Sequence, residues 1–200
     1  MAFQDVLKYA LAIARALEYC QDSAIPGSVV LHRDLKPDNI GFSIDQTVKI
    51  MDFGLAKIIE NACSSSDETY ELSGETGSLR YMAPEVAAGQ PYSHKVDVYS
   101  FGIILWEMNA GKKPFYGLNR DEFYSRVVKG GERPPLGRNW PEALCSLISE
   151  CWSSDMRKRP NFSEVAKRLE LMIQEENGGT KKKKSIRRIS NIIDRHSTWF

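Results

Sequence analysis

Apolar residues recur every three or four positions over residues 3–21, with polar residues between them. This spacing predicts an amphipathic helix, because an α-helix brings such positions onto one face. Ile25-Pro26-Gly27 interrupts the pattern, so the helix is expected to end before these residues. The residues predicted to face the core are Val6, Leu7, Ala10, Leu11, Ile13, Ala14 and Leu17.

Three short apolar runs follow this helix. Residues 29–31 precede a polar stretch, Ile40 and Phe42 follow it, and residues 47–51 alternate between apolar and polar. Such runs predict short strands, the first two buried, so the polar stretch between them is expected on a turn at the edge of a core. A concentrated set of charges on a loop anchored in this way is typical of a catalytic site.

Residues 93–110 are apolar on nearly every face, which predicts a helix in the middle of a domain. Ser93 is the expected N-cap and Gly111 the expected C-terminal stop. The chain contains no internal repeat. Three further helices are predicted at residues 122–128, 141–151 and 162–176, the last ending at Asn177-Gly178-Gly179.

Residues 52–85 form a long polar segment without a hydrophobic period. Composition alone predicts a flexible loop there. Hydroxyl-bearing residues are concentrated between Cys63 and Ser78, with acidic residues among them. They are Ser64, Ser65, Ser66, Thr69, Tyr70, Ser73, Thr76 and Ser78.

The composition is that of a globular protein, with 42% hydrophobic and 26% charged residues. The chain has no apolar run of membrane-spanning length and no secretory signal pattern. Its four cysteines form no C-x-x-C motif, which favours reduced thiols in the cytosol or nucleus. We therefore expect a cytoplasmic protein with neither a membrane nor a nucleic-acid partner.

The net charge of +1 conceals an asymmetry. Residues 177–200 hold seven basic residues against Asp194 alone, a charge of +6 that leaves −5 for the first 176 residues. Three interpretations of the basic run Lys181 to Arg188 stay open. It is a nuclear import signal, a segment that contacts an acidic surface or membrane, or a solvated disordered end. Arg187-Arg188-Ile189-Ser190 also resembles a site for a basophilic kinase.

Three motifs occur in order along the chain. They are His32-Arg33-Asp34-Leu35-Lys36-Pro37-Asp38-Asn39, then Asp52-Phe53-Gly54, then Ala83-Pro84-Glu85. Together they resemble the catalytic loop, the metal-binding element and the end of the activation segment of protein kinases. The resemblance covers about residues 1–176. It implies a mainly α fold, the large C-terminal lobe of a kinase with a few short β-strands around the catalytic loop. From their composition, residues 177–200 are expected to form a basic, disordered tail after it.

The resemblance implies a signalling enzyme that transfers the γ-phosphate of ATP to protein substrates, with Mg²⁺ as its metal. Asp34 would accept or orient the proton of the substrate hydroxyl, and Lys36 would contact the transferred phosphate. Asn39 and Asp52 would hold Mg²⁺ and the nucleotide phosphates through hard oxygen ligands. Lys36 favours serine/threonine kinases over tyrosine kinases, and Ser78 stands where the former usually carry a Thr that contacts the catalytic Asp.

Other residues receive regulatory or structural roles from the same resemblance. Arg33 resembles the arginine that binds a phosphorylated activation segment, with Thr76 and Ser73 as the leading phosphosites for an upstream activating kinase and Ser64–Ser66 behind them. Glu85 and Arg159 are expected to form a buried ion pair, and Asp97 to hydrogen-bond the backbone of the catalytic loop. The remaining expected structural positions are His32, Phe53 and Gly54.

Cys151-Trp152, taken with residues 81–86 and 100–102, is similar to the tyrosine-kinase-like group of serine/threonine kinases. Met156 departs from that group, which usually has Pro there. A metal site at Cys151 has no His or second Cys at ligand spacing, so packing is the better interpretation.

Residues 1–31 contain no G-x-G-x-x-G loop and no strand lysine of the V-A-I-K type. The small β lobe and the first helix of the large lobe are thus missing from these 200 residues. We expect the isolated chain to be inactive and to expose an apolar surface around Phe53 where a small lobe or another partner would dock. A non-catalytic scaffold and a split enzyme remain as alternatives.

Overall fold

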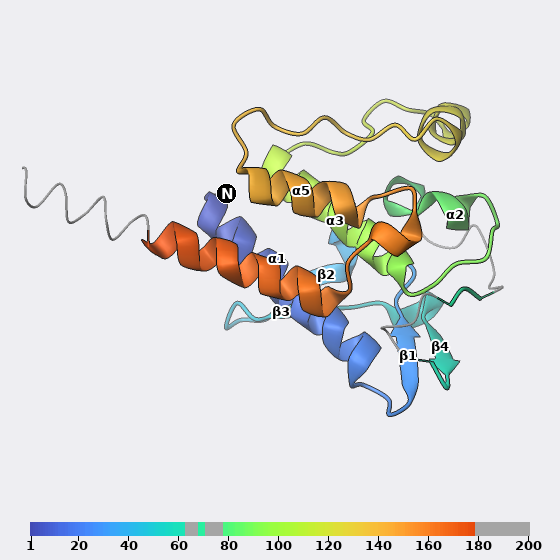
Figure 1. The fold of residues 1–200 in the computed structure, drawn as a ribbon, viewed down its shortest axis with the longest axis horizontal. Helices are drawn as coiled ribbons and strands as arrows, with labels where there is room; N and C mark the ends of the chain where they lie inside the picture. The colour runs from blue at the N-terminus through green and yellow to red at the C-terminus, as the bar shows by residue number, and fades with distance from the viewer. Residues whose placement is uncertain (63–67, 71–77, 179–200) are drawn as a thin grey trace, which may run out of the picture.

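The computed structural model describes residues 1–62, 68–70 and 78–178. Helices dominate it, and two small strand pairs lie beside them (Figure 1). None of the helices in the described ranges is long and apolar enough to cross a membrane. The predicted mainly α fold is confirmed.

The first helix, α1, spans Phe3–Asp22 and confirms the prediction over 3–21. All the residues predicted to face the core are buried except Leu11, which is half-buried. After the helix, the Ser23 N–H donates to the Tyr19 carbonyl, and Gly27 takes a left-handed φ of 70° in the turn that leads to the first strand. The helix therefore ends ahead of Ile25-Pro26-Gly27, as the sequence predicts.

The helix α3, Lys95–Ala110, packs against both α1 and α5 (Glu142–Cys151), as Figure 1 shows. Every residue from Lys95 to Trp106 is buried, which confirms the prediction of a central helix. It begins two residues later than predicted, with His94 in the N-cap position, while the Ser93 hydroxyl accepts a hydrogen bond from the Lys95 N–H. Gly111 ends it with a left-handed φ of 61°, which glycine adopts without steric cost.

The other predicted helices are present with shifted ends. Asn119 caps α4 (Arg120–Glu122) through a reciprocal hydrogen-bond pair with Glu122, and the chain continues as a π-helix over Phe123–Lys129. The last helix covers residues 162–178, so it passes the predicted end at 176. It buries Val165, Leu169 and Met172 as predicted, whereas Ile173 is half-buried. A short helix that was not predicted, α2, spans Pro84–Ala87.

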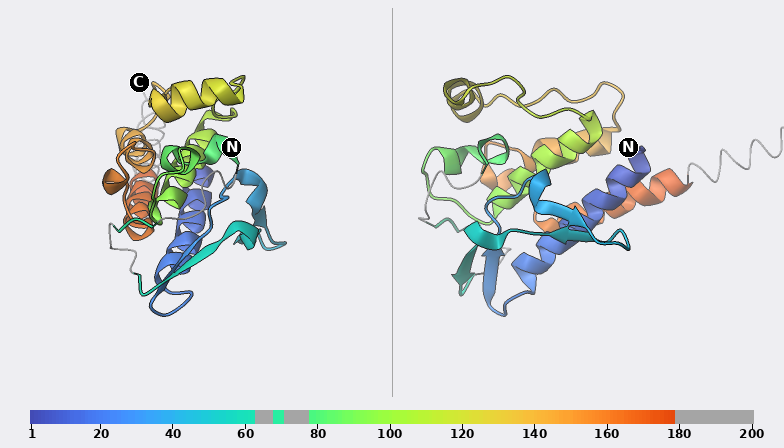
Figure 2. Two further views of the ribbon diagram at one scale, coloured as in Figure 1. Left: turned by 90° about the vertical axis from the view of Figure 1, so that its right-hand side faces the viewer. Right: turned by 180° about the vertical axis from the view of Figure 1, so that it is seen from behind.

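Within the described residues, four strands form two antiparallel pairs. β1 (Ser28–Leu31) pairs with β4 (Lys57–Glu60), and β2 (Ile40–Phe42) pairs with β3 (Val48–Ile50). β4 lies inside the polar segment 52–85, where composition alone predicts a flexible loop, and it was not predicted. The expectation of a buried strand at 40–42 is wrong, because Phe42 is 52% exposed. Figure 2 shows that β2 and β3 lie beside the helices rather than between them, so one of their faces is open.

Candidate active site

The loop that carries the polar motif connects β1 to β2 and is held by a buried carboxylate of α3. Asp97, 1% exposed, accepts hydrogen bonds from the backbone N–H groups of His32 (2.8 Å) and Arg33 (2.9 Å). Arg33 adopts a left-handed φ of 69°, a conformation that costs a non-glycine residue about 1–3 kcal/mol. The two Asp97 hydrogen bonds offset this strain. Burial raises the pKa of Asp97, although these two donors favour its ionised form.

The buried His32 ring connects the loop to the segment before Asp52. Its Nδ1 accepts from the Asp34 N–H at 3.3 Å, so the neutral ring carries its proton on Nε2. That Nε2 lies 2.9 Å from the Met51 carbonyl oxygen and donates to it. The ring also packs on Phe53, with centroids 4.8 Å apart. His32 therefore fixes the position of Asp34 relative to the Asp52-Phe53-Gly54 motif.

Three groups contact the Asp34 carboxylate. Lys36 Nζ lies 2.6 Å from Oδ2, the Ser78 N–H donates to Oδ1 at 2.7 Å, and Asn39 Nδ2 lies 3.3 Å from Oδ2. Burial opposes ionisation and is the largest influence, but Lys36 and Ser78 together outweigh it and hold the pKa of Asp34 below its usual value. Asp34 is thus an ionised carboxylate near neutral pH, at the edge of the core.

Asn39 and Asp52 present oxygen atoms suited to a hard cation. The Asn39 amide nitrogen donates to the Asp34 carbonyl oxygen at 2.8 Å, which leaves its side-chain oxygen as the free acceptor. Asp52 is exposed, has a left-handed φ of 60°, and accepts from the Gly54 N–H at 3.3 Å. Its charge helps to raise the pKa of Lys36, after the larger effect of Asp34.

In the described ranges no cluster of three His, Cys, Asp or Glu side chains forms a closed metal site. Asn39 and Asp52 instead fit Mg²⁺, which proteins bind through one or two side chains while substrate phosphates and water complete its shell. Cys151 lies in the core, where burial raises the pKa of its thiol to about 12. This supports packing over metal binding for Cys151-Trp152.

Ser78 contacts Asp34 through its backbone N–H, so this part of the activation segment lies against the catalytic loop. The Arg33 guanidinium lies 5.8 Å from the centre of the Tyr92 ring, and Tyr92 pairs with Tyr70 of the same segment through two backbone hydrogen bonds. Arg33 is therefore near this segment. The proposed phosphosites Ser73 and Thr76, and Ser64–Ser66, lie outside the described residues.

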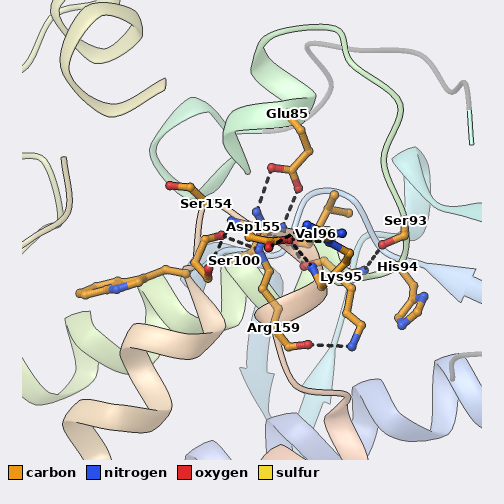
Figure 3. A network of polar contacts seen from close by, with 12 residues as sticks. Glu85, Ser93, His94, Lys95, Val96, Ser100, Ser154, Asp155 and Arg159 are labelled. Carbon is orange, nitrogen blue, oxygen red and sulfur yellow. Dashed lines mark hydrogen bonds and ion pairs between the residues drawn. The ribbon is translucent and has the colours of Figure 1, made fainter. Parts of the chain in front are cut away.

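Glu85 and Arg159, which the sequence pairs, form a bidentate ion pair at 2.6 and 2.9 Å (Figure 3). The side chain of Arg159 is 0% exposed and that of Glu85 7%. Sequence reasoning missed two further members of this network. Lys95 Nζ donates to the Arg159 carbonyl oxygen at 2.7 Å, and the guanidinium group lies 5.1 Å from the centre of the Tyr99 ring. Neither residue stands out in the apolar pattern, because Lys95 is the first residue of the helix and Tyr99 resembles any core aromatic.

Phe53 is 43% exposed, and three neighbouring apolar residues are exposed to a similar extent. These are Met51 (45%), Leu55 (40%) and Ile58 (48%). The expected apolar surface around Phe53 is therefore present in the chain as described.

A family model described as "protein tyrosine and serine/threonine kinase" matches residues 1–169. Among curated proteins, the chain is 39% identical over 170 residues to the serine/threonine/tyrosine-protein kinase HT1 of Arabidopsis thaliana. The matched region covers 85% of the chain and 40% of HT1. It is 41% identical over 169 residues to the serine/threonine-protein kinase VIK of the same organism. This matched region covers 82% of the chain and 37% of VIK.

A third relative, the dual specificity protein kinase shkE of Dictyostelium discoideum, is 41% identical over 141 residues, 70% of the chain and 19% of that protein. The chain thus spans 40% or less of the length of each of these three relatives.

Proposed function

The chain belongs to the protein tyrosine and serine/threonine kinase family, and from this premise we propose that it forms the phosphoacceptor side of a serine/threonine kinase active site. The proposed reaction transfers the γ-phosphate of ATP to a Ser or Thr hydroxyl of a protein substrate. The observation that carries the proposal is the ionised Asp34 carboxylate, held between Lys36, Asn39 and Ser78.

In this proposal Asp34 accepts a hydrogen bond from the substrate hydroxyl and takes its proton as the new bond to phosphorus forms. Its lowered pKa keeps it deprotonated at neutral pH, so it can accept this hydrogen bond and the proton. The Lys36 ammonium lies against the same carboxylate and stabilises negative charge on the transferred phosphoryl group. Ser78 and His32 keep the carboxylate in position.

Asn39 and Asp52 would hold Mg²⁺ through their oxygen atoms, and the metal supplies charge neutralisation across the nucleotide phosphates. Nothing in residues 1–31 offers the glycine-rich loop or strand lysine that covers ATP in this family. Positioning of reactants contributes up to about 7–11 kcal/mol to catalysis in favourable cases. We therefore expect no measurable phosphoryl transfer by these 200 residues alone.

The first prediction joins the chain to a kinase small lobe. We expect a fusion that carries the small lobe of HT1 ahead of Met1 to phosphorylate myelin basic protein on Ser and Thr, measured by radiolabelled phosphate transfer and phosphoamino-acid analysis. Asp34→Asn should lower the rate at least about a hundredfold, since general base catalysis typically contributes about 10²–10⁴. The matched control is Asp38→Asn, an exposed acidic residue of the same loop, which should retain activity.

Equal activity of the Asp34→Asn and parent fusions would overturn the proposed role of Asp34. Phosphotyrosine as the main product would overturn the proposed specificity, while leaving the kinase reaction intact. Activity of the unfused chain that Asp34→Asn abolishes would contradict the expected need for a small lobe.

A further inference from the structure

A large cavity of the described structure lies away from the catalytic loop. It is an open groove of about 870 Å³ between the C-terminal end of α3, the loop 111–117 and the segment 132–140. These segments run along the upper side of Figure 1. Its walls are apolar and largely aromatic: Trp106, Phe115, Tyr116, Pro135 and Trp140. Tyr116 is 86% exposed.

The walls of this groove are held in place by specific contacts. Trp106 Nε1 donates to the Pro135 carbonyl oxygen at 2.9 Å, which fixes the segment 132–140 to α3. Phe115 has a left-handed φ of 51° and packs edge-on against Phe123, with centroids 5.3 Å apart. The Trp140 indole lies so close to Gly137 that a Cβ there would be 2.5 Å from its Nε1. A rigid groove loses little entropy when a ligand binds.

The rim of the groove is positive. Lys112 and Lys113 are exposed, and Lys113 lies 3.3 Å from a carboxylate oxygen of Glu107. The lining carboxylate of Glu132 already accepts hydrogen bonds from Nε and Nη2 of Arg126, at 2.7 and 2.8 Å. Arg133 donates chiefly to backbone carbonyl oxygens, which do not neutralise its charge.

We propose that this groove binds a segment of a partner protein in which an aromatic or large aliphatic side chain is flanked by Asp or Glu. The apolar walls would bury the large side chain, and Lys112 and Lys113 would attract the acidic residues. The basic residues 181–188 of the chain have the wrong charge for this rim. The inference concerns binding and is independent of phosphoryl transfer.

The groove is also connected to the catalytic loop. The Arg80 guanidinium donates to the Pro114 carbonyl oxygen in the groove loop. Arg80 follows Ser78 by two residues, and the Ser78 N–H contacts Asp34. Arg80 and Ser78 thus link the groove loop 111–117 to the catalytic loop through hydrogen bonds.

The test uses the purified 200-residue chain and two pools of fluorescein-labelled decapeptides, measured by fluorescence anisotropy. Both pools have one central Phe, Trp or Leu; one pool carries flanking Asp and Glu, the other Lys and Arg. We expect the acidic pool to bind at least tenfold more tightly. The double variant Lys112→Glu/Lys113→Glu should reverse this preference, and because both lysines are exposed it should keep the melting temperature of the parent.

The matched control is Lys8→Glu/Lys167→Glu, which makes the same charge change on exposed parts of α1 and the last helix and should leave peptide affinity unchanged. An acidic pool with Gly at the centre should bind at least tenfold more weakly. Equal affinity for the acidic and basic pools would overturn the proposal. So would a loss of affinity for the acidic pool that is as large in Lys8→Glu/Lys167→Glu as in Lys112→Glu/Lys113→Glu. Light scattering tests whether the groove instead binds a second copy of the chain. A doubled molar mass that Lys112→Glu/Lys113→Glu abolishes, and the control variant does not, would overturn the proposal in favour of such a dimer.

Discussion

At the scale of single residues, charged groups account for most of the site. Asp97 and the Glu85–Arg159 pair are buried and hold the loops, whereas Asp34 and Lys36 lie at the edge of the core and face the reaction. The sequence predicted which residues carry these charges, because the motifs have fixed spacing. It did not predict that Lys95 and Tyr99 surround Arg159, because those contacts depend on how α3 packs.

The buried ion pair gives a prediction for stability. Arg159→Met leaves the Glu85 carboxylate in the core without its partner, and this should lower the free energy of unfolding by about 3–5 kcal/mol. The same change at Arg15, whose ion pairs with Glu18 and Glu170 are exposed, should cost no more than about 1 kcal/mol. Urea denaturation followed by circular dichroism measures both. Similar losses for the two variants would show that burial of the pair is unimportant.

The hydrogen bonds to Asp34 predict a pH dependence. The pKa of Asp34 is lower in the folded state than in the unfolded state, where it is about 3.9. Ionised Asp34 therefore contributes its full stabilisation above about pH 3.9, and this stabilisation is lost as the pH falls through the folded-state pKa. Lys36→Met should raise the pKa of Asp34, measured from its carboxyl ¹³C chemical shift, whereas the same change at the exposed Lys49 should not. An unchanged titration in Lys36→Met would mean that Lys36 does not govern this carboxylate.

At the scale of elements, periodicity predicted the long helices and missed the short pieces. α1 and α3 have many apolar positions, so their patterns are unambiguous. β4 has only Ile59 buried among its four residues, and its pairing with β1 depends on residues 26 or more positions away. The π-helical geometry of Phe123–Lys129 has no counterpart in the apolar spacing. Local patterns cannot predict elements whose stability comes from distant partners.

The contact between α3 and α5 gives a prediction at this scale. A Cβ added at Gly102 would lie 2.7 Å from the Cβ of Cys151, so Gly102→Ala should lower the free energy of unfolding by about 1–3 kcal/mol. Cys151→Gly removes the clashing atom and should recover part of this loss in the double variant. Cys151→Ala keeps that atom and serves as the control. Additive effects in Gly102→Ala/Cys151→Gly would show that the two helices are not in such close contact.

At the scale of the whole molecule, an apolar surface around Phe53 is left uncovered in the described residues. Met51, Phe53, Leu55 and Ile58 lie within eight consecutive positions and are each at least 40% exposed. The resemblance predicted this surface at Phe53, because a small lobe docks there in complete kinases. Its extension into β4 was not predicted, since β4 itself was missed.

This surface should make the isolated chain self-associate. We expect sedimentation velocity to show association that increases with concentration, and Leu55→Ser/Ile58→Ser to reduce it. Ile44→Ser/Leu171→Ser removes two equally apolar side chains that are exposed elsewhere, at 104% and 50%, and should leave association unchanged. The HT1 small-lobe fusion should suppress it without any substitution, because the added lobe covers the same residues. Association that persists in that fusion would place the contact on another part of the molecule.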